Sequence, residues 1–449
     1  MTRLHRIVGS TLSLGLVALL AAAAPGGPLP SPATATGTAT ENAALPQTQA
    51  LFDGYVRDGK MPGIVAAFGI GDQPTRFVAA GRLASDDDAA AVSPDSLWRV
   101  YSMTKPITAM AAMLLIEEGR IGLDDPVARY IPAFAHMTVA THPETSLAGV
   151  PAQRPITIRM LLTHTSGLSY NILAKGALLR EYERLGILPA AVSASIEPAM
   201  RRTRPATLAA FADRVAQAPL IAQPGTAWHY SVGLDVIGRV IEVAGGMPFD
   251  QFVNRRILAP LGMTSTYWTV PRGEAGRLAT NYAFTGDALV PLDPAATSVF
   301  LQPPSFPYGG AGLVSSARDY DRFLHMLSDE GTLDGVRILK PETVRLGLSN
   351  LLPAGVSYGG VRGATGGASG QATPMGYGAG GSVYLADGPG GIPSKGTYGW
   401  GGAAGTIAFV DPVKKIRGTI MVNYFPADRW PVREQTVRAF IADMARGQR

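Results

Sequence analysis

Residues 100–106 read VYSMTKP, which places Ser102 three residues before Lys105. No other lysine of the chain follows a serine at that spacing. The apolar residues that come next recur at helical spacing, which predicts a helix over about 102–118. Pro106 lacks an N–H and suits the first turn of a helix, so we expect Ser102 at or beside the helix N-terminus.

Two explanations of the Ser102 and Lys105 pair follow from this placement. Residues i and i+3 share a helix face, so the Lys105 amine can reach the Ser102 hydroxyl and act as its base. The helix N-terminus would then stabilise developing negative charge. In the other explanation Ser102 only caps the helix and Lys105 is solvated. The motif alone favours this second explanation, because short motifs often match by chance.

A rival nucleophile motif lies at residues 355–359, where GVSYG matches G-x-S-x-G around Ser357. That motif requires a strand, a turn and a helix, with a histidine later in the chain. The last histidine, His325, precedes Ser357, and the residues that follow are rich in glycine. We therefore interpret this match as accidental. A G-x-G-x-x-G match at 376–381 precedes a predicted strand rather than a helix, so it does not indicate a dinucleotide site.

Composition excludes several classes of function. The chain has 449 residues, of which 46% are hydrophobic and 16% are charged, enough to bury a large core. It has no cysteine, which excludes disulfides, a thiol nucleophile and thiolate metal sites. The net charge of +5 is scattered without a basic block, so no nucleic-acid partner is predicted. The histidines form no metal-binding motif, and no metal is predicted.

The N-terminus has the order typical of a secretory signal. Arg3 and Arg6 precede an uncharged, mostly apolar run over 7–24 that ends in small residues. This order predicts a cleaved signal peptide over 1–24 and a periplasmic or secreted protein. An uncleaved anchor is the alternative, since the run just reaches spanning length. Residues 25–45 are predicted to be a flexible linker, and 46–449 to be the catalytic domain.

Strand patterns occur at both ends of that domain. A hairpin is predicted over 64–70 and 76–80, and the helical middle is a predicted subdomain over about 106–300. Strand patterns return from about residue 376, at 382–385, 405–410 and 418–424, before a final helix over 432–444. Strands that flank a helical middle predict an α/β sheet domain with an inserted helical domain.

Four segments in order resemble a known family. YSMTKP resembles the S-x-x-K motif of serine β-lactamases and penicillin-binding proteins. LLTHTSGL at 161–168, WHYSVGLDVIGRVIE at 228–242 and YGWGGAAGTIAFVDP at 398–412 are similar to segments of class C β-lactamase-like hydrolases. The chain most resembles the family VIII carboxylesterases, which have W-G-G in place of K-T-G. The resemblance implies the β-lactamase/penicillin-binding-protein-like fold: an antiparallel sheet flanked by N- and C-terminal helices, with an inserted helical domain.

The resemblance also assigns roles to residues. It implies that Ser102 is the nucleophile, Lys105 its base and Tyr230 the residue that completes the proton network. The N–H groups of Ser102 and Ala403 are expected to form the oxyanion hole. The residues expected to contact substrate are Trp400, Gly401, Gly402 and Val232. Trp400 stands at the position of the K-T-G lysine, and Val232 at that of an asparagine in class C β-lactamases. His164 is expected to be structural.

The predicted function is that of an exported serine hydrolase that cleaves small-molecule carboxylic esters through an acyl-Ser102 intermediate, without metal or cofactor. Lys105 and Tyr230 are expected to titrate as one coupled pair, and the sequence leaves open which of them takes the proton. A D-amino-acid peptidase, an acyltransferase and a weak β-lactamase are alternatives at the same site. A catalytically silent scaffold or cell-wall-binding module is an alternative of another class, and the intact Ser102, Lys105 and Tyr230 argue against it.

Overall fold

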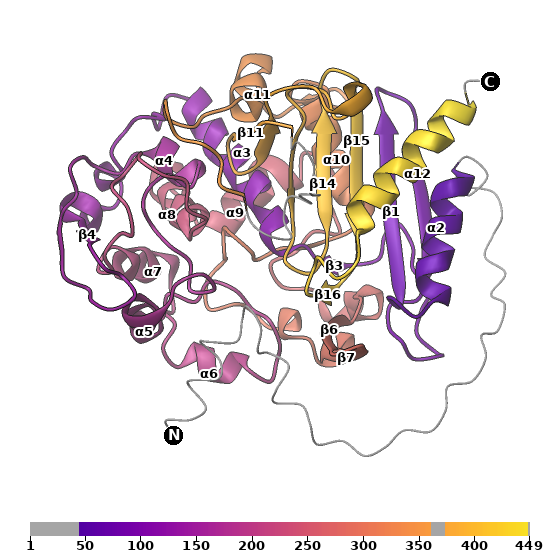
Figure 1. Ribbon diagram of the computed structural model, residues 1–449, viewed down its shortest axis with the longest axis horizontal. Coiled ribbons are helices and arrows are strands. Elements are labelled where there is room, and N and C mark those ends of the chain that lie inside the picture. The colour runs from indigo at the N-terminus through magenta and orange to yellow at the C-terminus, as the bar shows by residue number, and fades with distance from the viewer. Residues whose placement is uncertain (1–44, 361–372, 448–449) are drawn as a thin grey trace.

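A seven-stranded antiparallel sheet organises the chain in the computed structural model, which describes residues 45–360 and 373–447 (Figure 1). The strand order is β11-β12-β13-β14-β15-β1-β2. In that order the strands are Met375–Tyr377, Ser382–Tyr384, Tyr398–Gly401, Ile407–Asp411, Ile416–Met421, Gly63–Ile70 and Arg76–Gly81. The predicted signal peptide lies outside the described residues, as does the predicted linker except for Leu45.

The first and last parts of the domain meet in this sheet, because β1 pairs with β2 on one side and with β15 on the other. Strand β1 is buried along nearly its whole length. Its alternate residues serve two different cores: Ile64, Ala66 and Phe68 join one hydrophobic cluster, while Val65 and Ala67 join another. Both faces of the sheet are therefore covered.

Two terminal helices cover one face, as predicted. Helix α2 (Pro46–Arg57) lies beside α12 (Val432–Gly447), and both are seen at the right of Figure 1. The Phe68 ring of β1 stacks on Phe440 of α12 with ring centroids 4.1 Å apart. The Thr48 hydroxyl donates to the Asp443 carboxylate at 2.8 Å, which ties the two helices together although they come from opposite ends of the domain.

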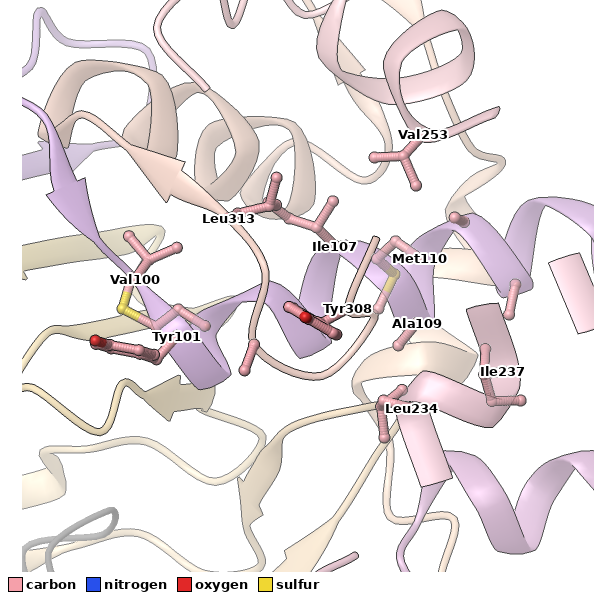
Figure 2. Packing of buried hydrophobic residues seen from close by; sticks show 14 of the residues in the cluster. Val100, Tyr101, Ile107, Ala109, Met110, Leu234, Ile237, Val253, Tyr308 and Leu313 are labelled. Atoms are coloured by element: carbon pink, nitrogen blue, oxygen red, sulfur yellow. The ribbon is translucent and has the colours of Figure 1, made fainter. Parts of the chain in front are cut away.

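The other face is covered by α10 (Ala317–Ser328), with α3 (Thr104–Glu117) and α11 (Pro341–Leu348) beyond it. Helix α3 is buried on all sides from Thr104 to Leu115, which is the pattern of a core helix. Figure 2 shows Ile107 and Met110 of α3 packed among Leu313 and side chains of the neighbouring helix α8 (Gly233–Gly245). The predicted helix thus forms the centre of the molecule.

The helical middle occupies the left of Figure 1. Its helices α4 to α9 are Ile158–Leu162, Gly176–Leu185, Glu197–Arg201, Leu208–Val215, Gly233–Gly245 and Phe249–Val253. The predicted 106–300 subdomain also contains strands: β4 (Thr138–Ala140) pairs with β5 (Gly149–Pro151), and β6 (Asn281–Thr285) pairs with β7 (Ala288–Asp293). Its boundaries stay a prediction.

Short strands complete the structure. Strand β3 (Trp98–Arg99) pairs with β8 (Val314–Ser315), and β9 (Thr332–Leu333) pairs with β10 (Val336–Arg337). The predicted strand over 418–424 is in fact two strands, because β15 ends at Met421 and β16 (Tyr424–Phe425) joins β6 in a separate sheet. Between them the Asn423 side chain accepts the Arg99 N–H at 3.1 Å, a contact that no local pattern reveals. No helix among the described residues is long and apolar enough to cross a membrane.

Candidate active site

A strained turn carries Ser102 to the start of α3. Tyr101, which precedes it, has φ of +40°, a conformation uncommon for a residue with a side chain. The Tyr101 side chain is buried, its ring contacts that of Phe300 edge-on, and its hydroxyl accepts from the Asn281 amide at 3.1 Å. These contacts hold the turn. Ser102 then lies in a 3₁₀ turn (Tyr101–Met103) just before α3, close to its predicted position.

Two side chains meet at the Ser102 hydroxyl. The Tyr230 hydroxyl donates to Ser102 Oγ at 2.7 Å, and Lys105 Nζ donates to the same oxygen at 3.2 Å. Tyr230 comes from the segment just before α8, 128 residues further along the chain. The three residues that were expected to act together are therefore brought together. A hydroxyl that contacts two groups able to exchange protons with it has the geometry of an activated nucleophile.

The Lys105 amine is fully buried and has a defined surrounding. It donates to the Gly310 carbonyl at 2.8 Å and lies over the Tyr230 ring, 4.6 Å from the centroid. The Tyr170 ring lies on another side, at 5.5 Å. Aromatic faces and a carbonyl oxygen both attract an ammonium group, so the site can hold Lys105 when it carries a proton.

The glycine pair at 309–310 forms this surrounding, and sequence reasoning missed it. The Thr108 hydroxyl donates to the Gly309 carbonyl at 2.7 Å, and the Gly310 N–H donates to Asp235 Oδ1 at 2.9 Å. A Cβ at Gly309 would lie 2.4 Å from the Leu234 carbonyl oxygen, and one at Gly310 would lie 2.7 Å from Asp235 Oδ2. Only glycine allows so close an approach, and two adjacent glycines were the one signal in the sequence.

Burial changes the ionisation of two neighbouring groups. It raises the pKa of Asp235 to about 7, against the opposing effect of the Lys105 charge. Burial, together with the Lys105 charge, lowers the pKa of His164 well below its usual value. His164 Nδ1 lies 3.0 Å from Ser231 Oγ and accepts from the Ser231 N–H at 3.2 Å. The hydrogen bonds of His164 thus go to the Ser231 segment and not to Ser102.

An aromatic cluster adjoins Tyr230 and contains Trp228, Tyr377 and Trp400, all buried. The Trp400 ring lies 5.7 Å from Tyr230 and 5.2 Å from Tyr377 between centroids. Strands β13 and β11 supply Trp400 and Tyr377, so the edge of the sheet builds one side of the site. Within the described residues, the indole N–H groups of Trp228 and Trp400 and the Tyr377 hydroxyl have no hydrogen-bond partner. Sequence reasoning did not single out Tyr377.

The turn after β13 packs close to the segment that leads into Ser102. A Cβ at Gly402 would lie 2.5 Å from the Val100 carbonyl oxygen and 2.1 Å from Thr406 Oγ1, so this glycine lets the turn pack against the segment that leads into Ser102. Gly401 ends the strand, paired with Ile407. Ala403, which follows, is exposed. This placement fits the expected role of the Ala403 N–H, which stays a prediction.

Val232 is placed differently from the expectation. Its side chain is fully buried in the main core and not in the aromatic cluster, at the residue that caps α8. It presents no surface to a substrate, because the first turn of α8 directs it inward. The expected substrate contact at Val232 is therefore not supported. No group of three acidic, histidine or cysteine residues within the described ranges could hold a metal ion.

Comparisons with known proteins agree with this site. A family model described as Beta-lactamase matches residues 48–441. Esterase EstB of Burkholderia gladioli is 31% identical over 83% of this chain and 89% of its own length. Protein Rv1367c of Mycobacterium tuberculosis is 34% identical over 76% of this chain and 80% of its own length. The solved structure of EstCE1, a hydrolase with promiscuous acyltransferase activity, is 27% identical, covers 88% of this chain and 98% of its own, and has a TM-score of 0.70. The predicted fold is confirmed.

Proposed function

Because the chain belongs to the β-lactamase family and is a serine hydrolase of esterase-like type, we propose that it cleaves small neutral carboxylic esters through an acyl-Ser102 intermediate. The observation that carries this proposal is the meeting of Tyr230 and Lys105 at Ser102 Oγ. Because the chain is an enzyme, the alternative of a catalytically silent scaffold is not proposed.

The geometry supports a two-step reaction. As Ser102 Oγ bonds to the ester carbonyl carbon, its proton passes to the coupled pair of Tyr230 and Lys105. The N–H groups of Ser102 and Ala403 are the donors that would stabilise the oxyanion. When the C–O bond breaks, the pair returns the proton to the leaving alcohol. Water then attacks the acyl-serine by the same route and releases the carboxylic acid and Ser102.

The aromatic cluster supports a preference for uncharged substrates. Trp400 stands where the resembling β-lactamases have a lysine that binds the substrate carboxylate, and Val232, where they have an asparagine, is buried in the core. Neither side chain carries a positive charge to bind a substrate carboxylate. Buried aromatic rings suit apolar acyl or alcohol groups instead. The similar protein EstB is described as an esterase and the similar structure EstCE1 as a hydrolase, which supports ester hydrolysis by this chain.

We expect kcat/KM for a short p-nitrophenyl ester to exceed that for a chromogenic cephalosporin by about 10²-fold or more. One missing hydrogen bond between charged groups, at roughly 1.5–3 kcal/mol, and one missing neutral hydrogen bond, at roughly 0.5–1.5 kcal/mol, together account for a factor of this size. The measurement is a pair of initial-rate series on one enzyme preparation, with a Ser102→Ala preparation as background. A larger value for the cephalosporin would contradict the esterase proposal.

Acyl transfer is the second candidate, favoured by the acyltransferase activity that EstCE1 is described as having. An alcohol that enters in place of water would take the acyl group from Ser102 by the same chemistry. Ester product formed in the presence of an added alcohol, in excess over free acid, would distinguish transfer from hydrolysis.

We also propose that the protein is exported, from the basic, apolar and small-residue order of residues 1–24. We expect the mature chain to begin shortly after Ala24 and to be found in the periplasm or outside the cell. N-terminal sequencing of the protein from each cell fraction tests this. Material that begins at Met1 and is found only with the cytoplasmic fraction would contradict it.

A further inference from the structure

Asp235 lies behind the Ser102 site and takes no part in the proposed reaction steps. It is fully buried in the first turn of α8. Its Oδ1 accepts the Gly310 N–H at 2.9 Å, and the carbonyl of the same glycine accepts from Lys105 Nζ at 2.8 Å. A single residue, Gly310, therefore connects the Asp235 carboxylate to the lysine that contacts Ser102.

The surroundings of Asp235 are costly for a carboxylate. Its Oδ2 has no hydrogen-bond partner within the described residues. A buried, half-satisfied carboxylate destabilises a fold, whereas a neutral side chain of the same shape would not. An acidic residue in the first turn also interacts favourably with the helix dipole, but that interaction typically stabilises a fold by only about 0.3–1 kcal/mol. A contribution to stability therefore does not explain why an aspartate stands at position 235. The negative charge that it places near Lys105 is the better explanation.

The other titratable groups around Asp235 are few. Lys105 of α3 and Tyr170 of the segment after α4 interact electrostatically with it, and Tyr230 lies against both. The His164 side chain is hydrogen-bonded to Ser231, two residues before α8 begins. Helices α7 and α9 meet α8 through apolar contacts such as Leu208 and Phe249 at Gly238. Lys105 is thus the cationic group that faces Asp235.

We propose that Asp235 is a positioning residue: through Gly310 it orients the Lys105 amine toward Ser102, and its negative charge stabilises the cation that forms when that amine takes the Ser102 proton. This inference rests on the proposed serine mechanism. The proton balance is simple, because the O–H bond of Ser102 breaks and an N–H bond forms on Lys105 while Asp235 stays ionised. An opposite charge in a buried site favours the charged form of its partner.

The ionisation of Asp235 makes the inference testable by pH. Burial raises the pKa of Asp235 to about 7, so its charge is lost as the pH falls through neutrality. The wild-type enzyme is expected to show an acid limb of kcat near pH 7. His164 does not account for such a limb, since its pKa is lowered well below the usual value.

Asp235→Asn keeps an acceptor for the Gly310 N–H and removes the charge. We expect kcat at pH 8 to fall by about 10-fold or more, KM to change by less than about 2-fold, and the acid limb to disappear. Asp319→Asn is the matched control. Asp319 of α10 is also a buried carboxyl with a raised pKa, but it accepts hydrogen bonds from the Ser265 N–H and the Thr266 hydroxyl instead of contacting Gly310. We expect the control to keep the wild-type pH profile.

Thermal unfolding separates positioning from a structural role. Because the folded-state pKa of Asp235 is raised above its unfolded value, its contribution to stability is full below about pH 4 and is lost as the pH rises through about 7. Asparagine does not ionise, so the variant does not lose this stability as the pH rises. The difference in Tm between Asp235→Asn and wild type is therefore expected to shift in favour of the variant from pH 4.5 to pH 8. A more stable and slower enzyme is the expected result.

Two results would overturn the inference. One is an Asp235→Asn enzyme with the wild-type kcat and acid limb; the other is a variant whose activity falls only in proportion to its folded fraction, with a lower Tm at pH 8. Both results are compared with the activities of the wild-type and Ser102→Ala proteins. If the wild-type protein hydrolyses esters and Ser102→Ala does not, the serine mechanism stands and the failure belongs to Asp235 alone.

Discussion

Replacing Ser102 by alanine is expected to lower kcat/KM for ester hydrolysis by about 10⁴-fold or more, which in practice abolishes it. The hydroxyl is where the Tyr230 and Lys105 hydrogen bonds converge, so its loss removes the attacking atom from the site. The fold should survive, because a single partly exposed oxygen is deleted before a helix that is buried along its length. Initial rates and labelling by a fluorophosphonate probe measure the effect, and circular dichroism checks the fold.

Ser357→Ala is the matched control for this prediction. Ser357 matches the rival G-x-S-x-G pattern but is exposed. We expect its replacement to leave both the rate and the labelling at wild-type levels. If Ser357→Ala is the variant that loses activity, the assignment of Ser102 is wrong.

Lys105→Met is expected to lower kcat by about 10²–10⁴-fold with little change in KM, the range for loss of a general base. Methionine has a similar length, so it fills the buried space while it removes the hydrogen bonds to Ser102 and Gly310. The change leaves the Gly310 carbonyl without its donor and Asp235 without its neighbouring amine, so Tm is expected to fall somewhat and kcat is compared at a temperature where the variant is folded. The kinetic constants and the melting curve are measured on the same preparation.

Lys340→Met, at an exposed lysine at the start of α11, serves as the control and should be silent. Tyr230→Phe completes the comparison, because it removes the other partner of Ser102 Oγ. A Lys105→Met enzyme that kept more than about a tenth of the wild-type kcat would contradict a base role for the lysine. In that case a much slower Tyr230→Phe enzyme would identify the phenol as the proton acceptor.

Sequence periodicity predicted the helices and strands whose formation depends on residues close together in the chain. The three-residue spacing of Ser102 and Lys105 puts both on one face at the start of α3, and Pro106 limits where that helix can begin. The hairpin of β1 and β2 and the terminal helix α12 were also predicted near their observed bounds. These elements follow from hydrogen bonding and side-chain alternation within a few residues, which the order of residues alone specifies.

Motif order extended the prediction to segments far apart. Tyr230 and Trp400 were named from the resemblance, and the structure places both beside the site. The same reasoning expected a substrate contact at Val232, whose side chain lies in the main core, because a shared position in a motif does not say which way a side chain points. Tyr230, in the site, and Val232, in the core, are only two residues apart, just before α8.

Tertiary structure alone decided the surroundings of Lys105. Asp235 and Gly310 are 75 residues apart, and Lys105 is 205 residues from Gly310. Nothing in the local pattern of any of these segments indicates that they touch, and they meet only when α8 and the 309–310 segment pack against α3. The sequence by itself determined the helix that begins beside Ser102 through local spacing, and it indicated the nucleophile through the order of four motifs. The charge beside the lysine arose from long-range packing, which depends on the shape of the whole core.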